Sequence, residues 1–224
     1  MTSQRSHTRH EPRRTARRVG RAPTMLVLMT ALAGCSADYP EEAVSTSTVA
    51  DPAGDVVVSG LGDDRETVAS APQNTEADIL TTTVEHRTDE VGFVVALRDL
   101  RPGQYLDLTA NVTTDSTGSR LPTQVTSLTY DGESTIDVYR ADGSSRCPAA
   151  DVAVDHDADT VTMSVPRTCL GDPRWIEATV VAATMRYDET PAGPHGDAVW
   201  EDDAYGTGQA EPAASGTSGR LHRP

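Results

Sequence analysis

The stretch Tyr105–Val112 reads YLDLTANV, and its side chains alternate between polar and apolar along its whole length. Successive side chains of a β-strand point to opposite faces of a sheet, so this pattern predicts a strand with one face on a core. The same period of two recurs along the middle of the chain. We predict strands at residues 56–58, 79–86, 91–97, 105–112, 125–130, 136–138, 152–154, 161–165 and 175–187.

Tight turns separate several of these segments. Asp131-Gly132 and Asp142-Gly143 supply residues that tolerate a positive φ, as two-residue turns between antiparallel strands require. The segment Arg87–Glu90 predicts a further hairpin, and the long apolar segment Trp175–Tyr187 predicts a central strand. About nine antiparallel strands indicate an all-β fold, a jelly-roll-like sandwich of two sheets.

The first 34 residues have the layout of a signal peptide. Five arginines between Arg13 and Arg21 precede an uncharged stretch of 13 residues, Ala22–Gly34. A helix needs about 20 apolar residues to cross a bilayer, so this stretch is too short for a permanent anchor. The alternative to a lipoprotein signal is an ordinary secretory signal with a cysteine after it by chance.

The residues Leu32–Cys35 read LAGC and resemble the bacterial lipobox. The resemblance implies cleavage before Cys35, a lipid on its thiol, and a protein tethered to the extracytoplasmic face of the cell membrane. We therefore expect residues 1–34 to be a lipoprotein signal peptide and residues 35–50 a flexible tether. Residues 51–205 would form the sandwich, followed by a disordered tail at 206–224, which is rich in Gly, Ala, Ser and Pro.

Charge narrows the range of partners. The chain after residue 34 holds 12 arginines, no lysine and 33 acidic residues, a formal charge of about −21. Such a domain is repelled by nucleic acids, which excludes them as ligands, whereas cations and cationic partners remain compatible.

Two cysteines remain after Cys35, and they lie at the outer ends of one predicted hairpin. Cys147 precedes the segment at 152–154, and Cys169 follows the segment at 161–165. The ends of paired strands are close enough for a disulfide, and export places the thiols in an oxidising compartment. We predict a Cys147–Cys169 disulfide, the alternative being two free thiols.

A candidate calcium site begins where the tether ends. In Asp51-Pro-Ala-Gly-Asp55 a Pro-Gly turn brings two carboxylates together, and hard cations prefer oxygen ligands of this kind. Asp202 and Asp203 complete the site if the first and last strands are neighbours. The alternative is an Asx-capped turn and an unrelated acidic loop.

The acidic run Asp155–Asp159 also alternates like the ligands of a calcium loop. However, Thr160 stands where that loop needs a glycine, and Pro166 stands where it needs a glutamate. We interpret the run as the solvated tip of a hairpin.

Aromatic residues are few. Trp200 and Tyr205 lie in an acidic segment that we expect to be a loop, where they either stack on a sugar ring or close the sandwich edge. No zinc-binding spacing, nucleophile elbow or glycine-rich phosphate loop occurs. Pairs of Asp and Glu are abundant on so acidic a chain and leave a hydrolase open.

Several short motifs resemble uncharacterised secreted proteins of high-GC Gram-positive bacteria. They are Asp51–Asp55, Ala77–Ile79, Arg98–Leu100 and Val165–Trp175. The opening is also distantly similar to carbohydrate-binding module family 9 and to DOMON-like sandwiches, some of which hold calcium, haem or sugar. The resemblance spans about residues 51–205 and implies a β-sandwich, although no Met–His pair for haem and no aromatic sugar clamp can be placed on this sequence.

Two functions follow as hypotheses. The first is a non-enzymatic surface lipoprotein whose sandwich binds a cell-wall glycan or a protein, with a structural calcium ion. The second is a hydrolase that acts on envelope polymers through an Asp/Glu pair.

Overall fold

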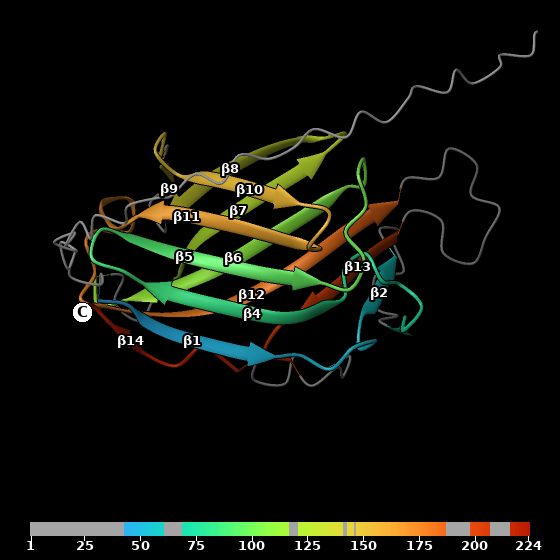
Figure 1. The fold of residues 1–224 in the computed structure, drawn as a ribbon, viewed down its shortest axis with the longest axis horizontal. Helices are drawn as coiled ribbons and strands as arrows, with labels where there is room; N and C mark the ends of the chain where they lie inside the picture. The colour runs from blue at the N-terminus through green and yellow to red at the C-terminus, as the bar shows by residue number, and fades with distance from the viewer. Residues whose placement is uncertain are drawn as a thin grey trace, which may run out of the picture. The chain divides into compact units, whose positions relative to one another are not determined.

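The computed structural model describes residues 43–60, 69–116, 121–140, 143–145, 147–186, 198–206 and 216–224. These residues belong to one compact unit, Glu41–Pro224. They form two antiparallel sheets and one short 3-10 helix, η1 (Arg167–Leu170). The predicted all-β sandwich is therefore confirmed (Figure 1).

The first sheet has five strands in the order β1-β4-β5-β11-β10. Their bounds are β1 Ser45–Ala50, β4 Ile79–His86, β5 Glu90–Leu97, β11 Thr160–Pro166 and β10 Asp151–Asp155.

The second sheet runs in the order β3-β2-β13-β12-β6-β7-β8-β9, and β14 pairs with β12 outside this path. Its strands are β3 Ala69–Ser70, β2 Val57–Gly60, β13 Ala198–Asp203, β12 Trp175–Arg186, β6 Leu106–Thr114, β7 Thr123–Tyr130, β8 Glu133–Arg140, β9 Gly143–Ser145 and β14 Leu221–His222. β12 lies between β13 and β6, so the prediction of a central strand is confirmed.

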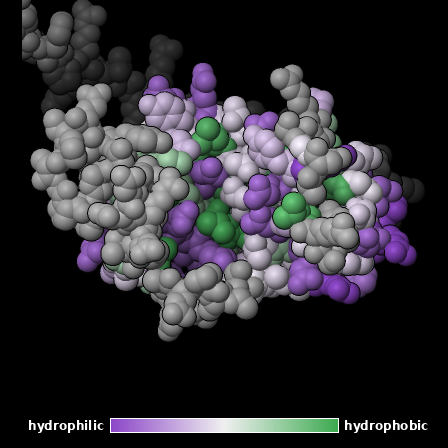
Figure 2. Space-filling model, turned by 180° about the vertical axis from the view of Figure 1, so that it is seen from behind, coloured by the Kyte–Doolittle hydropathy of each residue, from purple (hydrophilic) through white to green (hydrophobic). Residues whose placement is uncertain are grey.

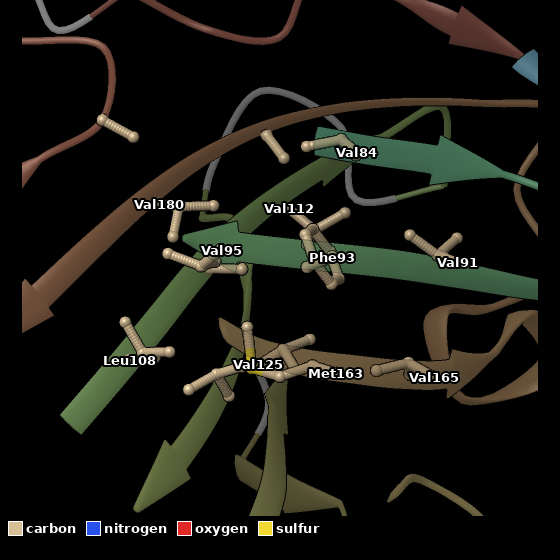
Figure 3. Close-up of a cluster of buried hydrophobic side chains, with 14 of the residues drawn as sticks. Val84, Val91, Phe93, Val95, Leu108, Val112, Val125, Met163, Val165 and Val180 are labelled. Carbon is tan, nitrogen blue, oxygen red and sulfur yellow. The ribbon is translucent and has the colours of Figure 1, made fainter. Parts of the chain in front are cut away.

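The core fills the space between the two sheets. Phe93 of β5 and Met163 of β11 come from the first sheet, and Leu108 of β6, Val125 of β7 and Val180 of β12 come from the second (Figure 3). All five side chains are at most 1% exposed. Full burial of such a side chain contributes about 1.5–3 kcal/mol, so the alternation seen in the sequence is the main source of stability.

All nine predicted segments form strands, and the turn chemistry is as expected. Asp131 and Gly132 both have positive φ, 52° and 80°, in the two-residue turn that joins β7 to β8. The acidic run forms the β10–β11 hairpin tip, where Asp155 Oδ1 accepts the N–H groups of Asp157 and Ala158. Asp142 lies outside the described residues.

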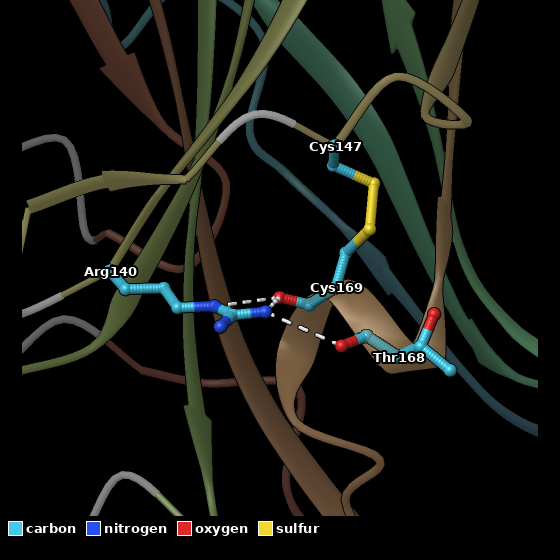
Figure 4. Close-up of a disulfide and its surroundings, with 4 residues drawn as sticks. All are labelled: Arg140, Cys147, Thr168 and Cys169. Carbon is cyan, nitrogen blue, oxygen red and sulfur yellow. Dashed lines mark hydrogen bonds between the residues drawn. A yellow bond between two sulfur atoms is a disulfide. The ribbon is translucent and has the colours of Figure 1, made fainter.

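The predicted disulfide between Cys147 and Cys169 is present, with a Cα–Cα distance of 5.8 Å (Figure 4). Cys147 follows β9 of the second sheet, whereas Cys169 lies in η1, directly after β11 of the first sheet. Arg140 of β8 reinforces this connection by donating to the carbonyls of Cys169 (3.0 Å from Nε) and Thr168 (3.3 Å). The cross-link closes a 22-residue separation and stabilises the fold by about 3 kcal/mol.

The predicted tether is too long, because its last six residues form β1. Ser45–Ala50 pairs with β4 from Ser45↔His86 to Ala50↔Thr81, and Thr48 and Thr83 share a hydrogen bond of 2.9 Å. The segment STSTVA has few apolar side chains because β1 is an edge strand with one exposed face.

The predicted disordered tail is also wrong for residues 216–224. Leu221 is 6% exposed and belongs to the core, and its carbonyl lies 3.0 Å from Nδ1 of the fully buried His86. Ser218 Oγ accepts the N–H of Ala178 at 3.0 Å, and Arg220 stacks over the Trp175 ring at 4.3 Å. Backbone pairing and one buried leucine thus hold a segment whose composition is typical of a linker.

The outer faces of the sheets are largely polar. On the second sheet Thr109 shares a hydrogen bond with Thr126 (3.1 Å), and Gln124 donates to Asn111 (3.1 Å). Seen from behind the view of Figure 1, hydrophobic colour is confined to small patches among hydrophilic ones (Figure 2). One face of each strand is therefore buried and the other is solvated, as the alternation predicts.

The C-terminal strand yields the first prediction. Leu221→Ala should lower the free energy of unfolding by about 2–3 kcal/mol, because it removes a buried side chain from the core. His222→Ala is the matched control, since the neighbouring His222 is exposed and should change stability by less than about 0.5 kcal/mol. Urea denaturation of both variants measures the difference. Equal stability of the two variants would show that the segment does not pack on the core.

Candidate functional site

The predicted turn at Asp51–Asp55 forms at one end of the sandwich. Asp51 follows β1 and donates its N–H to the carbonyl of Leu80 at 2.9 Å. Gly54 has φ +84°, a conformation that favours glycine, and its N–H donates to both carboxylate oxygens of Asp78 at 3.1 and 2.9 Å. The turn is therefore fixed to the start of β4 before any ion is considered.

Asp78 is the carboxylate that orders this turn. Its side chain is fully buried, and Arg98 Nη1 pairs with it at 3.0 Å. The two Gly54 hydrogen bonds and the arginine satisfy its charge, so Asp78 has a structural role.

Asp202 comes to the same place from β13 of the second sheet. It is 4% exposed, and its Oδ2 accepts the N–H of Ile79 at 2.7 Å. Ile79 is the first residue of β4, so this hydrogen bond joins the two sheets at their edge. β2 also pairs with β13, from Val57↔Glu201 to Gly60↔Ala198, so the first predicted strand and the last segment of the domain are neighbours.

Asp51, Asp55 and Asp202 form a cluster, which we call the carboxylate triad. Each contributes one carboxylate oxygen, and these oxygens lie within 4.8 Å of one another. Asp51 Oδ2 and Asp55 Oδ1 are buried and have no hydrogen-bond partner. Buried polar atoms are nearly always satisfied, so two orphaned oxygens in one cluster indicate a missing partner.

The electrostatics of the triad point the same way. Burial, then the charges of Asp202 and Asp55, raises the pKa of Asp51 from 3.8 to about 8. Burial, with the charges of Asp55 and Asp78, also raises the pKa of Asp202 to about 7, against the opposing hydrogen bond from Ile79. Burial raises the pKa of Asp55 in the same direction. Without a cation, the triad is stable only if it holds protons.

Asp203 does not join the triad, although the sequence made it a candidate. It follows Asp202 directly, so its side chain points to the opposite face of β13. Its Oδ1 instead accepts the N–H of Tyr205 at 3.1 Å in the turn after the strand. Sequence alone could not choose between these two neighbours, because the choice depends on the register Val181↔Asp203.

Trp200 and Tyr205 were expected in one loop, and the structure separates them. Trp200 lies within β13, opposite Thr184 of β12 and on the same face as Asp202. Tyr205 follows the strand and packs against the core, and its hydroxyl is buried without a partner. Tyr205 is therefore a packing residue, whereas Trp200 faces a surface groove.

The groove has a volume of about 560 Å³ and lies where β12 and β13 meet two loops. Gln73, Asn74 and Glu76 line it from the loop before β4, and Arg101 and Gln104 line it from the loop before β6. Thr184, Met185 and Trp200 complete the described lining. Sequence analysis missed every one of these residues except Trp200, because the two loops carry no motif.

The raised pKa values give a prediction for the protein in chelator. A carboxyl group with a folded-state pKa above 3.8 stabilises the fold fully below about pH 4, and this contribution is lost as the pH rises towards 8. Asp51→Asn should therefore be more stable than wild type at pH 8, by about 2 kcal/mol, and nearly equal to it at pH 4.5. Urea unfolding at both pH values measures this.

Asp137→Asn is the control, because Asp137 is exposed on β8, far along the sheet order from β13. It should change stability little at either pH. A difference between Asp51→Asn and wild type that is the same at both pH values would contradict a protonated triad.

Cys35, the predicted site of lipid attachment, lies outside the described residues. Within the described ranges no helix is long and apolar enough to cross a membrane. Comparison of the chain with models of protein families, with curated proteins and with solved structures finds no match.

Proposed function

We propose that this chain is an extracytoplasmic lipoprotein whose sandwich is clipped by a calcium ion and acts as a binding domain. The observation that carries the cation is the carboxylate triad with its two orphaned oxygens. Calcium replaces the repulsion between the carboxylates with attraction. It connects the turn after β1 to β13, and therefore the first sheet to the second.

The ligand set favours calcium over other metals. All three members are carboxylates, which suit hard cations, whereas zinc sites usually include histidine or cysteine. Calcium accepts six to eight oxygens in an irregular arrangement, so backbone carbonyls and waters can supply the rest. Magnesium demands a near-ideal octahedron and usually keeps several waters, which a buried triad accommodates less well.

The arrangement supports a structural role for this ion. Asp202 is almost fully buried and already holds the N–H of Ile79, so the triad lies within the sheet edge. In the groove, Glu76 is the carboxylate among the described lining residues, and it pairs with Arg101 at 3.7 Å. A hydrolase of the glycosidase type needs two carboxyl groups facing one substrate, so a binding domain has better support.

The proposed address rests on the leader and on the disulfide. The lipobox-like segment Leu32–Cys35 follows a basic, then apolar, leader. The Cys147–Cys169 bond suits an oxidising compartment outside the cytosol. Calcium in the millimolar range, as some extracellular modules require, fits the same side of the membrane.

Calcium should raise the melting temperature of the protein. A ligand that binds only the folded state stabilises it by about 2.7 kcal/mol at 100 times its Kd, which corresponds to a shift of several degrees. Thermal unfolding in calcium and in chelator measures this shift for wild type and for Asp51→Asn/Asp55→Asn. The double variant should lose it.

Asp203→Asn is the matched control, because Asp203 is adjacent to Asp202 but faces away from the triad. It should keep the full calcium shift. Identical wild-type melting curves in calcium and chelator would remove the clip, and a full shift in the double variant would place the ion elsewhere.

The anchor is tested at Cys35. Cys35→Ser should abolish incorporation of radiolabelled palmitate and move the protein from the washed membrane fraction to the soluble fraction, because the serine cannot form the thioether. Cys169→Ser is the control for loss of a cysteine elsewhere and should leave the label in place. A processed Cys35→Ser protein that stays in washed membranes would exclude lipid as the anchor.

A further inference from the structure

We infer that the groove beside Trp200 is a binding site for a neutral saccharide. This inference rests on the proposed binding function and assigns it to a site. It is carried by buried polar atoms that lack a partner and that line the groove together with an aromatic ring.

Thr184 is the decisive residue. The inward positions of β12 are Ile176, Ala178, Val180 and Ala182, all at most 1% exposed, and Thr184 is the next in this series. Thr184 is 2% exposed, and its Oγ1 has no hydrogen-bond partner. A buried hydroxyl without a partner costs about 1–3 kcal/mol, so a hydroxyl at this apolar position needs an explanation. A ligand hydroxyl in the groove supplies the missing partner.

Gln104 presents a second unsatisfied group to the same groove. Its Oε1 accepts the N–H of Arg101 at 2.9 Å, which fixes the amide plane and turns Nε2 away from that bond. Nε2 is buried and has no partner. Gln104 therefore offers an oriented donor, and Thr184 offers a group that both donates and accepts.

Trp200 supplies the apolar surface that a sugar ring requires. It is directly opposite Thr184 in the β12–β13 pair, so the ring and the hydroxyl lie on the same face of the sheet. The faces of pyranose rings carry C–H groups, which pack on an aromatic face while the ring hydroxyls point sideways to polar groups. Stacking and hydrogen bonding thus act on one ligand.

The charges of the groove favour a neutral ligand. Arg101 pairs with Glu76 and with Asp99, and Thr75 also donates to Asp99 at 3.2 Å, so the rim is nearly balanced. The strongly acidic domain repels anionic polymers. A volume of about 560 Å³ lies within the range of small-ligand sites, which is roughly 300–1,000 Å³.

The test uses the full chain in a detergent without a sugar headgroup, with calcium present. Isothermal titration measures binding of cellotriose, maltotriose, chitotriose and, as an anionic comparison, trigalacturonate. At least one neutral trisaccharide should bind. Trp200→Ala should weaken it by at least about tenfold, and Trp175→Phe, which changes the other tryptophan, should not.

Thr184→Val separates a ligand role from a structural one. Valine has the same shape without the orphaned hydroxyl, so the unliganded protein should be as stable as wild type or more stable. The same variant should bind the trisaccharide up to about tenfold more weakly. A structural role would move stability and leave binding unchanged.

Three results would overturn the inference: no binding of any neutral trisaccharide, preference for trigalacturonate, or binding that Trp200→Ala and Thr184→Val leave intact. The calcium melting shift, measured on the same samples, distinguishes its failure from that of the clip. A retained calcium shift without saccharide binding removes the groove and leaves the cation site. A lost calcium shift with intact saccharide binding does the reverse.

Discussion

Period-two alternation is the constraint on which the rest of this structure depends. Once the register of a strand is set, every second side chain faces the other sheet and must be apolar or satisfied. The fold meets this condition with valine, leucine and alanine along β5, β6 and most of β12. The inward polar residues Asp202 and Thr184 stand out against this background, and each has an atom or a neighbour that lacks a partner. Both lie at the same end of the sandwich.

That end brings together two sites of different chemistry. Trp200 and Asp202 are two residues apart on one face of β13, so about 7 Å of strand separates the groove from the carboxylate triad. An ion that holds β13 against the start of β4 would also hold Trp200 in place relative to the loop before β4, which lines the groove. Rigid positioning of this kind lowers the entropic cost of binding. The clip therefore has a reason to lie beside the groove.

The sequence predicted what depends on local pattern and failed where register decides. Segments with clear alternation, such as Tyr105–Val112, were found, and so were the turn at Asp131-Gly132 and the disulfide. β1 and β14 were missed because their residues are polar or flanked by glycine, and their pairing comes from partners far away in the chain. Tertiary pairing overrides weak local propensity in such edge strands.

The candidate site divides in the same way. Asp51 and Asp55 were recognisable because a Pro-Gly turn lies between them, and Asp202 because it stands in an acidic pair. The roles of Asp78 and Ile79 left no trace in the sequence, since each acts through a backbone N–H or a distant arginine. Thr184 looked like one more strand residue, because threonine is favoured in strands and nothing local shows that its hydroxyl is buried. A buried hydroxyl becomes informative only when its surroundings are known, which is why the groove required the structure.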